Sequence, residues 1–246
     1  MKILVCVSKT PDTTAKVSFS SDAKAYNSAG VQFIMNPYDE WYALVRAIDL
    51  AKQTGGTCTI FSVGGADVDA IIRKGLAIGA NGAVRVNAEA VSAMFVARQA
   101  ADYAAANGFD VVFTGKETID YNGSEVGAMM AEMLDWPFVS YGSALTWADN
   151  TATISRDIEG GVEVIEVEAP FVLSASKGMA EQRIPNMIGI VQAKNKPLVV
   201  IEPVASAALT EVSSFTMPAE KTAVKLVAAD NMDELVRLLH DEAKVI

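Results

Sequence analysis

Histidine is nearly absent from this sequence of 246 residues, and cysteine is scarce. The one histidine, His240, stands beside Leu238 and Leu239, where we expect it on the surface of a helix. A single histidine argues against Ser-His-Asp catalysis and against metal sites built on histidine. The two cysteines, Cys6 and Cys58, lie in separate apolar segments and form no CxxC pair. We expect them to be buried thiols of a reducing compartment.

Positive charge and long apolar runs are also in short supply. Lys and Arg number 20 against 30 Asp and Glu, so the formal net charge is −10. This balance argues against generic nucleic-acid binding, which relies on a basic surface. No apolar run reaches the ~20 residues of a membrane helix, and residues 1–7 resemble a first strand more than a signal peptide. A cytoplasmic protein without nucleic-acid partners or membrane insertion is therefore expected.

Strand and helix signals alternate through the first half of the chain. The apolar runs typical of strands occupy residues 2–8, 57–63, 83–86 and 111–114. Helical spacing occupies residues 38–53, 68–78, 92–106 and 127–134. This alternation predicts an α/β fold with a doubly wound, mostly parallel sheet of Rossmann-like type. Because ligands bind at the carboxyl ends of such strands, the loops after Val7, at Gly64-Gly65 and at Gly115 are candidate sites.

The pattern changes after residue 140. Alternating segments at 152–159 and 162–168 flank Gly160-Gly161, which predicts an antiparallel hairpin. Later segments predict strands at 171–175 and 197–202, a polar stretch at 205–216 and an amphipathic helix at 232–242. Because this end has little core of its own, it is either an arm that docks on a partner or a frayed tail with one covering helix.

The most informative segment runs from Gly115 to Val126. It joins a strand to a helix through small residues, which leaves backbone N–H groups at a positive helix end where a phosphate can bind. The alternative is a tight connection that needs glycine for its backbone angles. Asp120 and Glu125 could accept hydrogen bonds from ribose or cap a helix. Lys116 could pair with a phosphate or extend into solvent.

Asn36-Pro37-Tyr38-Asp39-Glu40 is a second candidate. Asn36 before Pro37 favours a turn, and proline suits the first position of a helix. Asn36 could cap that helix or contact an adenine or ribose.

Other nucleotide motifs are missing: there is no GxGxxG, and Thr114-Gly115-Lys116 lacks the upstream glycine of a P-loop. Neither a nicotinamide site nor Walker-type ATP hydrolysis is expected.

These motifs, in this order, resemble those of the beta subunit of electron transfer flavoprotein. The resemblance covers nearly the whole chain, and its specificity comes from collinear order rather than from any single motif. The matching segments are 9–12, 35–40, 73–80, 115–120, 134–137, 156–161 with Glu163, 169–170 and 189–196.

The resemblance implies an electron carrier subunit rather than an enzyme. An alpha subunit would hold most of the FAD, and this chain would close against it and bury a structural AMP. Electrons would come from the acyl-CoA dehydrogenases of fatty acid oxidation and leave to a membrane quinone oxidoreductase. Residues 1–190 would form the nucleotide-binding α/β domain, and residues 191–246 would form a C-terminal arm and helix that dock on the alpha subunit.

Site residues also follow from the resemblance. Tyr38 and Thr13 would lie nearest the dimethylbenzene edge of the flavin. Met179 would stand where the family places an exposed leucine that docks into acyl-CoA dehydrogenases, so we expect an exposed, flexible methionine. The nucleotide site would comprise Cys6, Asn36, Pro37, Tyr38, Asp39, Val63, Gly115, Lys116, Glu117, Thr118, Ile119, Asp120, Tyr121, Asn122, Gly123, Ser124, Glu125 and Val126.

Departures from the family pattern keep alternatives open. The segment 121–125 interrupts the usual loop, and some relatives bind a second FAD in place of AMP and bifurcate electrons with NADH. The segment 180–184 departs from the usual docking run, so the dehydrogenase partners can differ. A stand-alone adenine-nucleotide-binding regulatory domain is a further alternative, which predicts a stable monomer with reversible nucleotide exchange.

Overall fold

Residues 1–220 and 223–246 are described by a computed structural model. Their contacts divide them into two compact units. The larger comprises Met1–Val17 and Asn27–Ser213, and the smaller comprises Ser18–Tyr26 and Ser214–Ile246. None of the described helices combines the length and the apolar character needed to cross a membrane.

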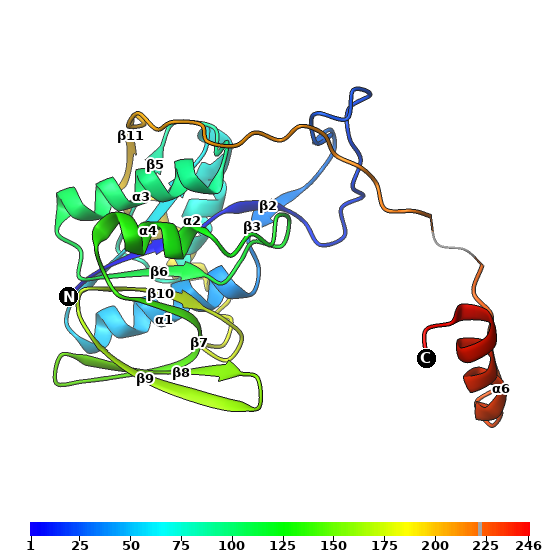
Figure 1. Ribbon diagram of the computed structural model, residues 1–246. Helices are drawn as coiled ribbons and strands as arrows, with labels where there is room; N and C mark the ends of the chain where they lie inside the picture. Colours follow the sequence, from blue (N-terminus) through cyan, green and yellow to red (C-terminus); the bar gives the residue numbers. More distant parts are fainter. Residues whose placement is uncertain (221–222) are drawn as a thin grey trace. The chain divides into compact units, whose positions relative to one another are not determined.

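The larger unit is built on a nine-stranded sheet, in the order β11-β5-β4-β1-β6-β10-β7-β8-β9 (Figure 1). Its parallel strands are β11 (Leu198–Ile201), β5 (Gly82–Val86), β4 (Thr57–Val63), β1 (Lys2–Cys6), β6 (Val111–Gly115), β10 (Phe171–Ala175) and β7 (Phe138–Ala148). β8 (Thr151–Ile158) and β9 (Gly161–Glu168) continue the sheet in antiparallel fashion. A separate antiparallel ribbon is formed by β2 (Lys9–Pro11) and β3 (Phe33–Met35).

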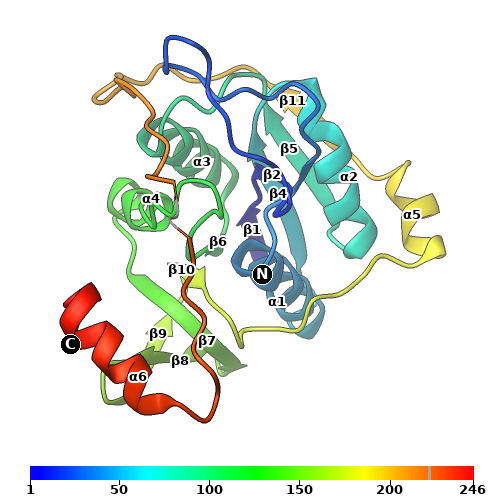
Figure 2. The same ribbon diagram turned by 90° about the vertical axis from the view of Figure 1, so that its right-hand side faces the viewer.

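Helices cover both faces of the parallel strands (Figures 1 and 2). Along β1, Ile3 and Val5 pack in the cluster that contains the buried side chains of α1 (Asp39–Gln53) and α2 (Asp69–Ile78). The alternate residues, Leu4 and Cys6, pack in the cluster that contains α3 (Ala93–Asn107) and α4 (Val126–Leu134). A strand buried on both faces needs a continuous apolar run, which is what the sequence of β1 provides. The predicted doubly wound fold is therefore confirmed.

Outside the central parallel strands, the structure contains both predicted and unpredicted elements. The hairpin is confirmed, with Ile158 opposite Gly161 at its tip. Strand β7 was not predicted, because its buried residues Val139, Gly142 and Leu145 recur at every third position instead of every second. The ribbon β2–β3 and helix α5 (Met187–Ala193) were also missed, since each is too short for a periodic signal. Residue 190 falls inside α5, and β11 beyond it belongs to the large sheet.

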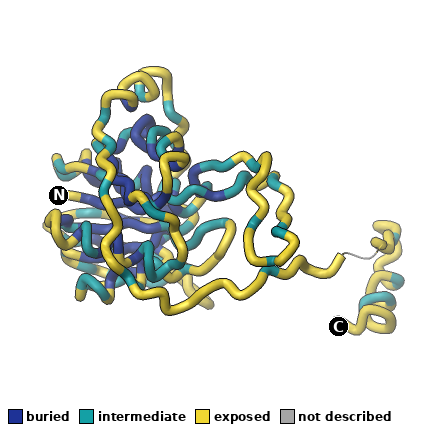
Figure 3. The backbone as a smooth tube through the Cα atoms, turned by 90° about the horizontal axis from the view of Figure 1, so that it is seen from above, coloured by how far each residue is buried: buried dark blue, intermediate teal, exposed yellow. Residues whose placement is uncertain are grey.

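The smaller unit contains helix α6 (Met232–Arg237), which continues as the π-helical segment η2 (Leu238–Ala243). No residue of either segment is buried, and Figure 3 colours this end of the chain largely as exposed. Phe19 and Phe215 stack with ring centroids 4.7 Å apart, and the N–H of Phe215 donates to the carbonyl of Ala23 at 2.7 Å. One aromatic stack is a small core, which leaves the helix with little to pack on.

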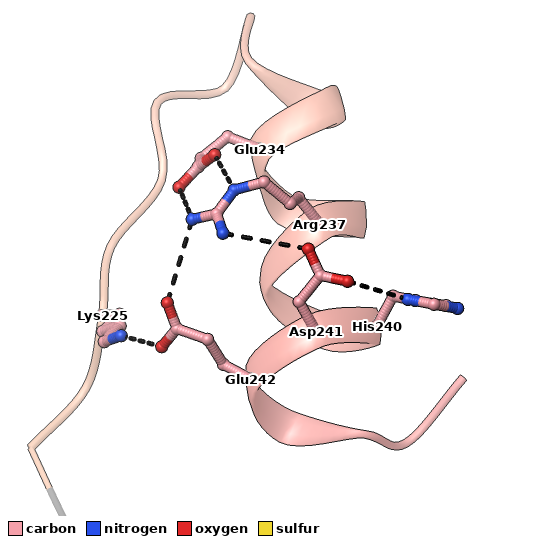
Figure 4. Close-up of polar contacts among 6 residues, drawn as sticks. All are labelled: Lys225, Glu234, Arg237, His240, Asp241 and Glu242. Atoms are coloured by element: carbon pink, nitrogen blue, oxygen red, sulfur yellow. Dashed lines mark hydrogen bonds and ion pairs between the residues drawn. The ribbon is translucent and has the colours of Figure 1, made fainter.

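Charged side chains of this helix form ion pairs with one another (Figure 4). The Arg237 guanidinium makes two hydrogen bonds of 2.8 Å to Glu234 and lies 3.9 Å from Asp241. Exposed ion pairs of this kind contribute little to stability. The side chain of His240 is 71% exposed and points Nδ1 at Asp241, 3.0 Å away. Its predicted place on a helix surface is confirmed.

Candidate functional site

The candidate loops meet at one edge of the large sheet. Strand β1 lies between β4 and β6, and all three run in the same direction. Cys6, Val63 and Gly115 end these strands, so the segments that follow them leave the sheet at the same carboxyl edge. This is the edge where open α/β sheets bind ligands. The convergence expected from the sequence is confirmed.

Helix α1 begins directly against Gly115. A Cβ on this glycine would lie 2.7 Å from both the backbone nitrogen and the Cγ of Glu40. The next residue is held from the other side, since the Lys116 N–H donates to the carbonyl of Ala175 in β10 at 2.8 Å. Glycine is thus required here for close approach of α1 to β6, which is a structural demand additional to any role in ligand binding.

The side chain of Asn36 holds the loop after β6. Its amide nitrogen donates to the carbonyl of Glu117 at 3.1 Å, and its Oδ1 accepts from the N–H of Ile119 at 3.1 Å. Asn36 is fully buried, and its own N–H donates to the carbonyl of Ser8 at 2.9 Å. It does not cap α1, because Tyr38 takes that position with φ of 66°. Asn36 therefore acts on the loop rather than on the helix.

Carboxylates crowd the entrance of this loop. Lys116 is paired with Glu117, with Nζ 2.9 Å from Oε1, and this contact raises the pKa of Lys116. Burial raises the pKa of Asp39, and the nearby Lys116 partly opposes the rise. Asp120 accepts from the N–H of Tyr121 at 3.0 Å. A phosphate here would depend chiefly on backbone donors, and the carboxylates would suit ribose hydroxyls better.

The start of α4 offers such donors. The first turn of a helix has N–H groups without intrahelical partners, and Glu125 at the N-cap makes no side-chain cap. The Thr114 hydroxyl is buried and has no hydrogen-bond partner within residues 1–220 and 223–246. A Cβ on Gly127 would come 2.8 Å from that hydroxyl. An anion at a helix N-terminus can satisfy both kinds of group, so the residues fit a nucleotide phosphate.

Cys6 lies on the α4 side of this edge. Its Sγ is 3.9 Å from the Sδ of Met130. Burial, and secondarily the charge of Glu40, raise the pKa of the Cys6 thiol far above neutrality. Cys58 is also buried and free, so the expected burial of both thiols is confirmed. Such a thiol can pack against a ligand but does not act as a nucleophile.

Glu40 belongs to the second candidate segment, but the sequence interpretation gave it no place among the nucleotide-site residues. Its side chain is 5% exposed, and its carboxylate accepts from the Ser8 N–H at 2.7 Å and from the Ser8 hydroxyl at 2.8 Å. Burial raises the pKa of Glu40 to about 8; the Ser8 bonds oppose the rise and Asp120 adds to it. A signal existed, because Glu40 falls on the apolar stripe of α1 with Ala43, Leu44 and other buried residues.

The expectation of an exposed Met179 is wrong. This side chain is 5% exposed and belongs to the hydrophobic core, where its Cε lies 2.9 Å from the place of a Cβ on Gly142. The preceding Gly178 has φ of 103°, and this turn accompanies the inward path of the chain. The exposed apolar side chains of this region come later, at Ile184 (82%), Met187 (74%) and Ile188 (69%).

We expect Asn36→Leu to loosen the loop while keeping the core filled. Leucine has a similar volume but leaves the carbonyl of Glu117 and the N–H of Ile119 without their partner, which costs about 2 kcal/mol. Hydrogen exchange at Ile119 should become at least about tenfold faster. Asn195→Leu, on an exposed side chain, is the matched control. Unchanged exchange at Ile119 would show that Asn36 does not hold the loop.

Comparisons with known proteins match this chain to electron transfer proteins over most of its length. A family model described as "Electron transfer flavoprotein domain" matches residues 24–206. Over 261 aligned residues the chain is 33% identical to "Electron transfer flavoprotein subunit beta" of Bacillus subtilis strain 168, with all of both chains covered. The human protein of the same name is 29% identical over 255 residues, covering 100% of this chain and 99% of that one. "Acryloyl-CoA reductase electron transfer subunit gamma" of Anaerotignum propionicum is 31% identical over 209 residues, covering 82% of this chain and 78% of that one. This chain therefore belongs to the electron transfer flavoprotein beta subunit family.

Proposed function

We propose that this chain pairs with an FAD-bearing alpha subunit and carries electrons from acyl-CoA or related dehydrogenases to a membrane quinone oxidoreductase. Family membership supports flavin-linked electron transfer. The name of the Anaerotignum relative supports an acyl-CoA oxidoreductase as the partner. FAD, when bound, supplies the redox chemistry, so the chain is a carrier subunit rather than an enzyme. Its own residues bind the nucleotide, exclude water and meet the partners.

The observation that carries this proposal is the buried Asn36 amide, which ties the turn before α1 to the loop after β6. The loop Gly115–Val126 and the start of α4 would bind the phosphate of AMP, with the Thr114 hydroxyl beside them. The strand ends at Cys6 and Val63 would flank the nucleotide. Tyr38 is 52% exposed, and Thr13 is also exposed, so both are free to face a flavin held by the alpha subunit.

The C-terminal arm is proposed to dock on the alpha subunit. In this proposal residues 1–190 bind the nucleotide and residues 191–246 reach the partner. The arm carries many apolar side chains that nothing in its own unit covers, and exposed apolar surface of this extent is typical of a partner interface. In the smaller unit the most exposed are Leu226 (92%), Val224 (80%), Val245 (67%) and Ile246 (66%).

Identification of the released nucleotide tests the proposal. The chain is purified natively with its alpha partner, denatured, and analysed by chromatography and mass spectrometry. We expect one AMP per chain together with one FAD per heterodimer. Two FAD and no AMP would contradict the AMP site and favour an NADH-linked bifurcating protein. A monomer that exchanges ATP reversibly would favour a stand-alone regulatory domain instead.

Dehydrogenase docking is proposed to use the segment Ser176–Ile188. Arg183 fixes this segment to α1. Its side chain makes two hydrogen bonds of 2.9 Å to Asp49, and its backbone carbonyl accepts from the Trp41 indole at 3.3 Å. Beyond this anchor, Ile184 and Ile188 present exposed apolar side chains. Met179, which is buried in the core, would support the conformation of the segment rather than contact the partner. Exposed apolar residues beside a fixed anchor suit a docking contact.

Ile184→Asp should weaken electron transfer from the dehydrogenase without harming the fold. A charge at an 82% exposed position costs little in the free protein, but it is unfavourable in a desolvated contact. We expect KM for an acyl-CoA dehydrogenase that reduces the wild-type heterodimer to rise about tenfold or more. Val164→Asp, at a 61% exposed position on β9, is the control. Equal KM values for both variants would place the docking surface elsewhere.

A further inference from the structure

Glu40 occupies the centre of the three segments that form the candidate site. Its carboxylate bonds to Ser8 after β1, and its backbone touches Gly115 at the end of β6. Asn36, just before it in the chain, holds the loop that continues from Gly115. A change in the protonation of the Glu40 carboxylate therefore affects both the end of β1 at Ser8 and the loop after β6.

Burial is the chief reason why a negative charge on Glu40 is unfavourable; the hydrogen bonds from Ser8 and Asn36 favour the charge but do not outweigh burial. The ionisable groups that influence it or neighbour it are Asp120 from the loop, Asp39 beside it and the Cys6 thiol from β1, none of which supplies a positive charge. Lys116, the cation of this loop, is engaged with Glu117. Among the described residues no salt bridge involves Glu40, and its side chain is almost completely shielded from water. A buried carboxyl without a cation is more stable in its neutral form.

We propose that Glu40 is a positioning residue of the nucleotide site that must hold a proton when an anionic nucleotide is bound. This inference rests on the proposed AMP site. A phosphate adds negative charge at the same edge of the sheet, so binding is more favourable when Glu40 is neutral. A protonated carboxyl can donate to the Ser8 hydroxyl while its other oxygen accepts from the Ser8 N–H, so the loop geometry is preserved.

The consequence is that nucleotide affinity depends on pH. Since burial raises the pKa of Glu40 to about 8, affinity should stay level between pH 7 and 7.5 and fall above pH 8. The fall should approach about tenfold for each pH unit, which corresponds to uptake of one proton on binding. The second ionisation of AMP itself occurs near pH 6. It therefore lies below this range and is common to all variants.

Equilibrium dialysis with AMP tests the inference. The full chain is purified with its alpha partner, freed of nucleotide by charcoal treatment, and dialysed against AMP between pH 7 and 9.5. We expect the wild-type affinity to fall above pH 8 and the affinity of Glu40→Gln to remain level, since glutamine stays neutral. Glu132→Gln, on an exposed side chain of α4, should follow the wild type.

Ser8→Ala provides an independent variant that keeps Glu40. The hydrogen bond from the Ser8 hydroxyl opposes the raised pKa of Glu40, so its loss should move the midpoint of the pH profile upward. Parallel pH profiles for wild type, Glu40→Gln and Ser8→Ala would overturn the inference and leave the AMP site standing. Failure of the wild type to bind AMP at any pH would contradict the proposed nucleotide site, and this inference with it.

Discussion

With AMP bound as proposed, a Gly115→Ala variant should be purified almost free of the nucleotide and should unfold at a lower temperature than the wild type. The new methyl group would lie 2.7 Å from the backbone nitrogen of Glu40 and 3.1 Å from the carbonyl carbon of Asp39. Backbone atoms are not displaced as easily as the end of a flexible side chain, so β6 and the start of α1 have to separate. Overpacking of this kind costs about 1–3 kcal/mol.

The loss of AMP has its own physical reason. Separation of α1 from β6 pulls the Ser8–Glu40 bonds and the Asn36 amide away from the loop, and a site displaced by a few tenths of an ångström loses backbone donors. We expect AMP content to fall about tenfold or more, as measured by chromatography after denaturation.

A glycine in open space provides the control for Gly115. A Cβ on Gly161, in the hairpin turn between β8 and β9, would meet nothing within 4 Å, so Gly161→Ala should retain its AMP and melt like the wild type. Normal AMP content in Gly115→Ala would mean that the loop does not need the close approach of α1.

The stability of the protein should fall as pH rises from about 6 to about 8, and Glu40 should account for a large part of the fall. The folded state holds the pKa of Glu40 at about 8, above its ordinary value of 4.5. Between these values the folded state binds more protons than the unfolded state. Stability gained from this group is therefore fully present at low pH and is lost as pH rises through the folded pKa.

The expected size of this effect follows from the same linkage. The slope approaches about 1.4 kcal/mol for each pH unit, so the wild type should lose about 2 kcal/mol between pH 6 and pH 8 through this group. Urea unfolding of the full chain, followed by tryptophan fluorescence, measures the free energy of unfolding at each pH. Glu40→Gln should lack this component, whereas Glu132→Gln should retain it. Identical slopes for wild type and Glu40→Gln would contradict an ionisable buried Glu40.

Much of the larger unit could be predicted from local patterns. The central strands β1, β4 and β6 are buried on both faces, so their sequences are continuous apolar runs that stand out without knowledge of their neighbours. Helix α3 also has local boundaries, because the Ser92 hydroxyl accepts from the Phe95 N–H at 3.1 Å and Gly108 ends the helix in the left-handed conformation. Such signals are contained within a few residues.

The side-chain roles within the site could not be predicted in the same way. The sequence interpretation left Asn36 open between a helix cap and a nucleotide contact, and its actual partners lie 81 and 83 residues away. Met179 was expected to be exposed because it stands where the family places an exposed leucine, but the packing of β7 and β8 around Gly142 buries it. Burial depends on which segments meet, and that information is distributed over the whole chain.

The sequence by itself determined the alternation of strands and helices, the carboxyl-edge loops and the hairpin, since hydrophobic period, turn residues and caps act over a few residues. Tertiary structure alone decided that β10 inserts between β6 and β7, that Met179 turns inward, and that Glu40 is closed off from water beside Ser8. The physical reason is that a charge or a methionine acquires its properties from neighbours that only folding brings together.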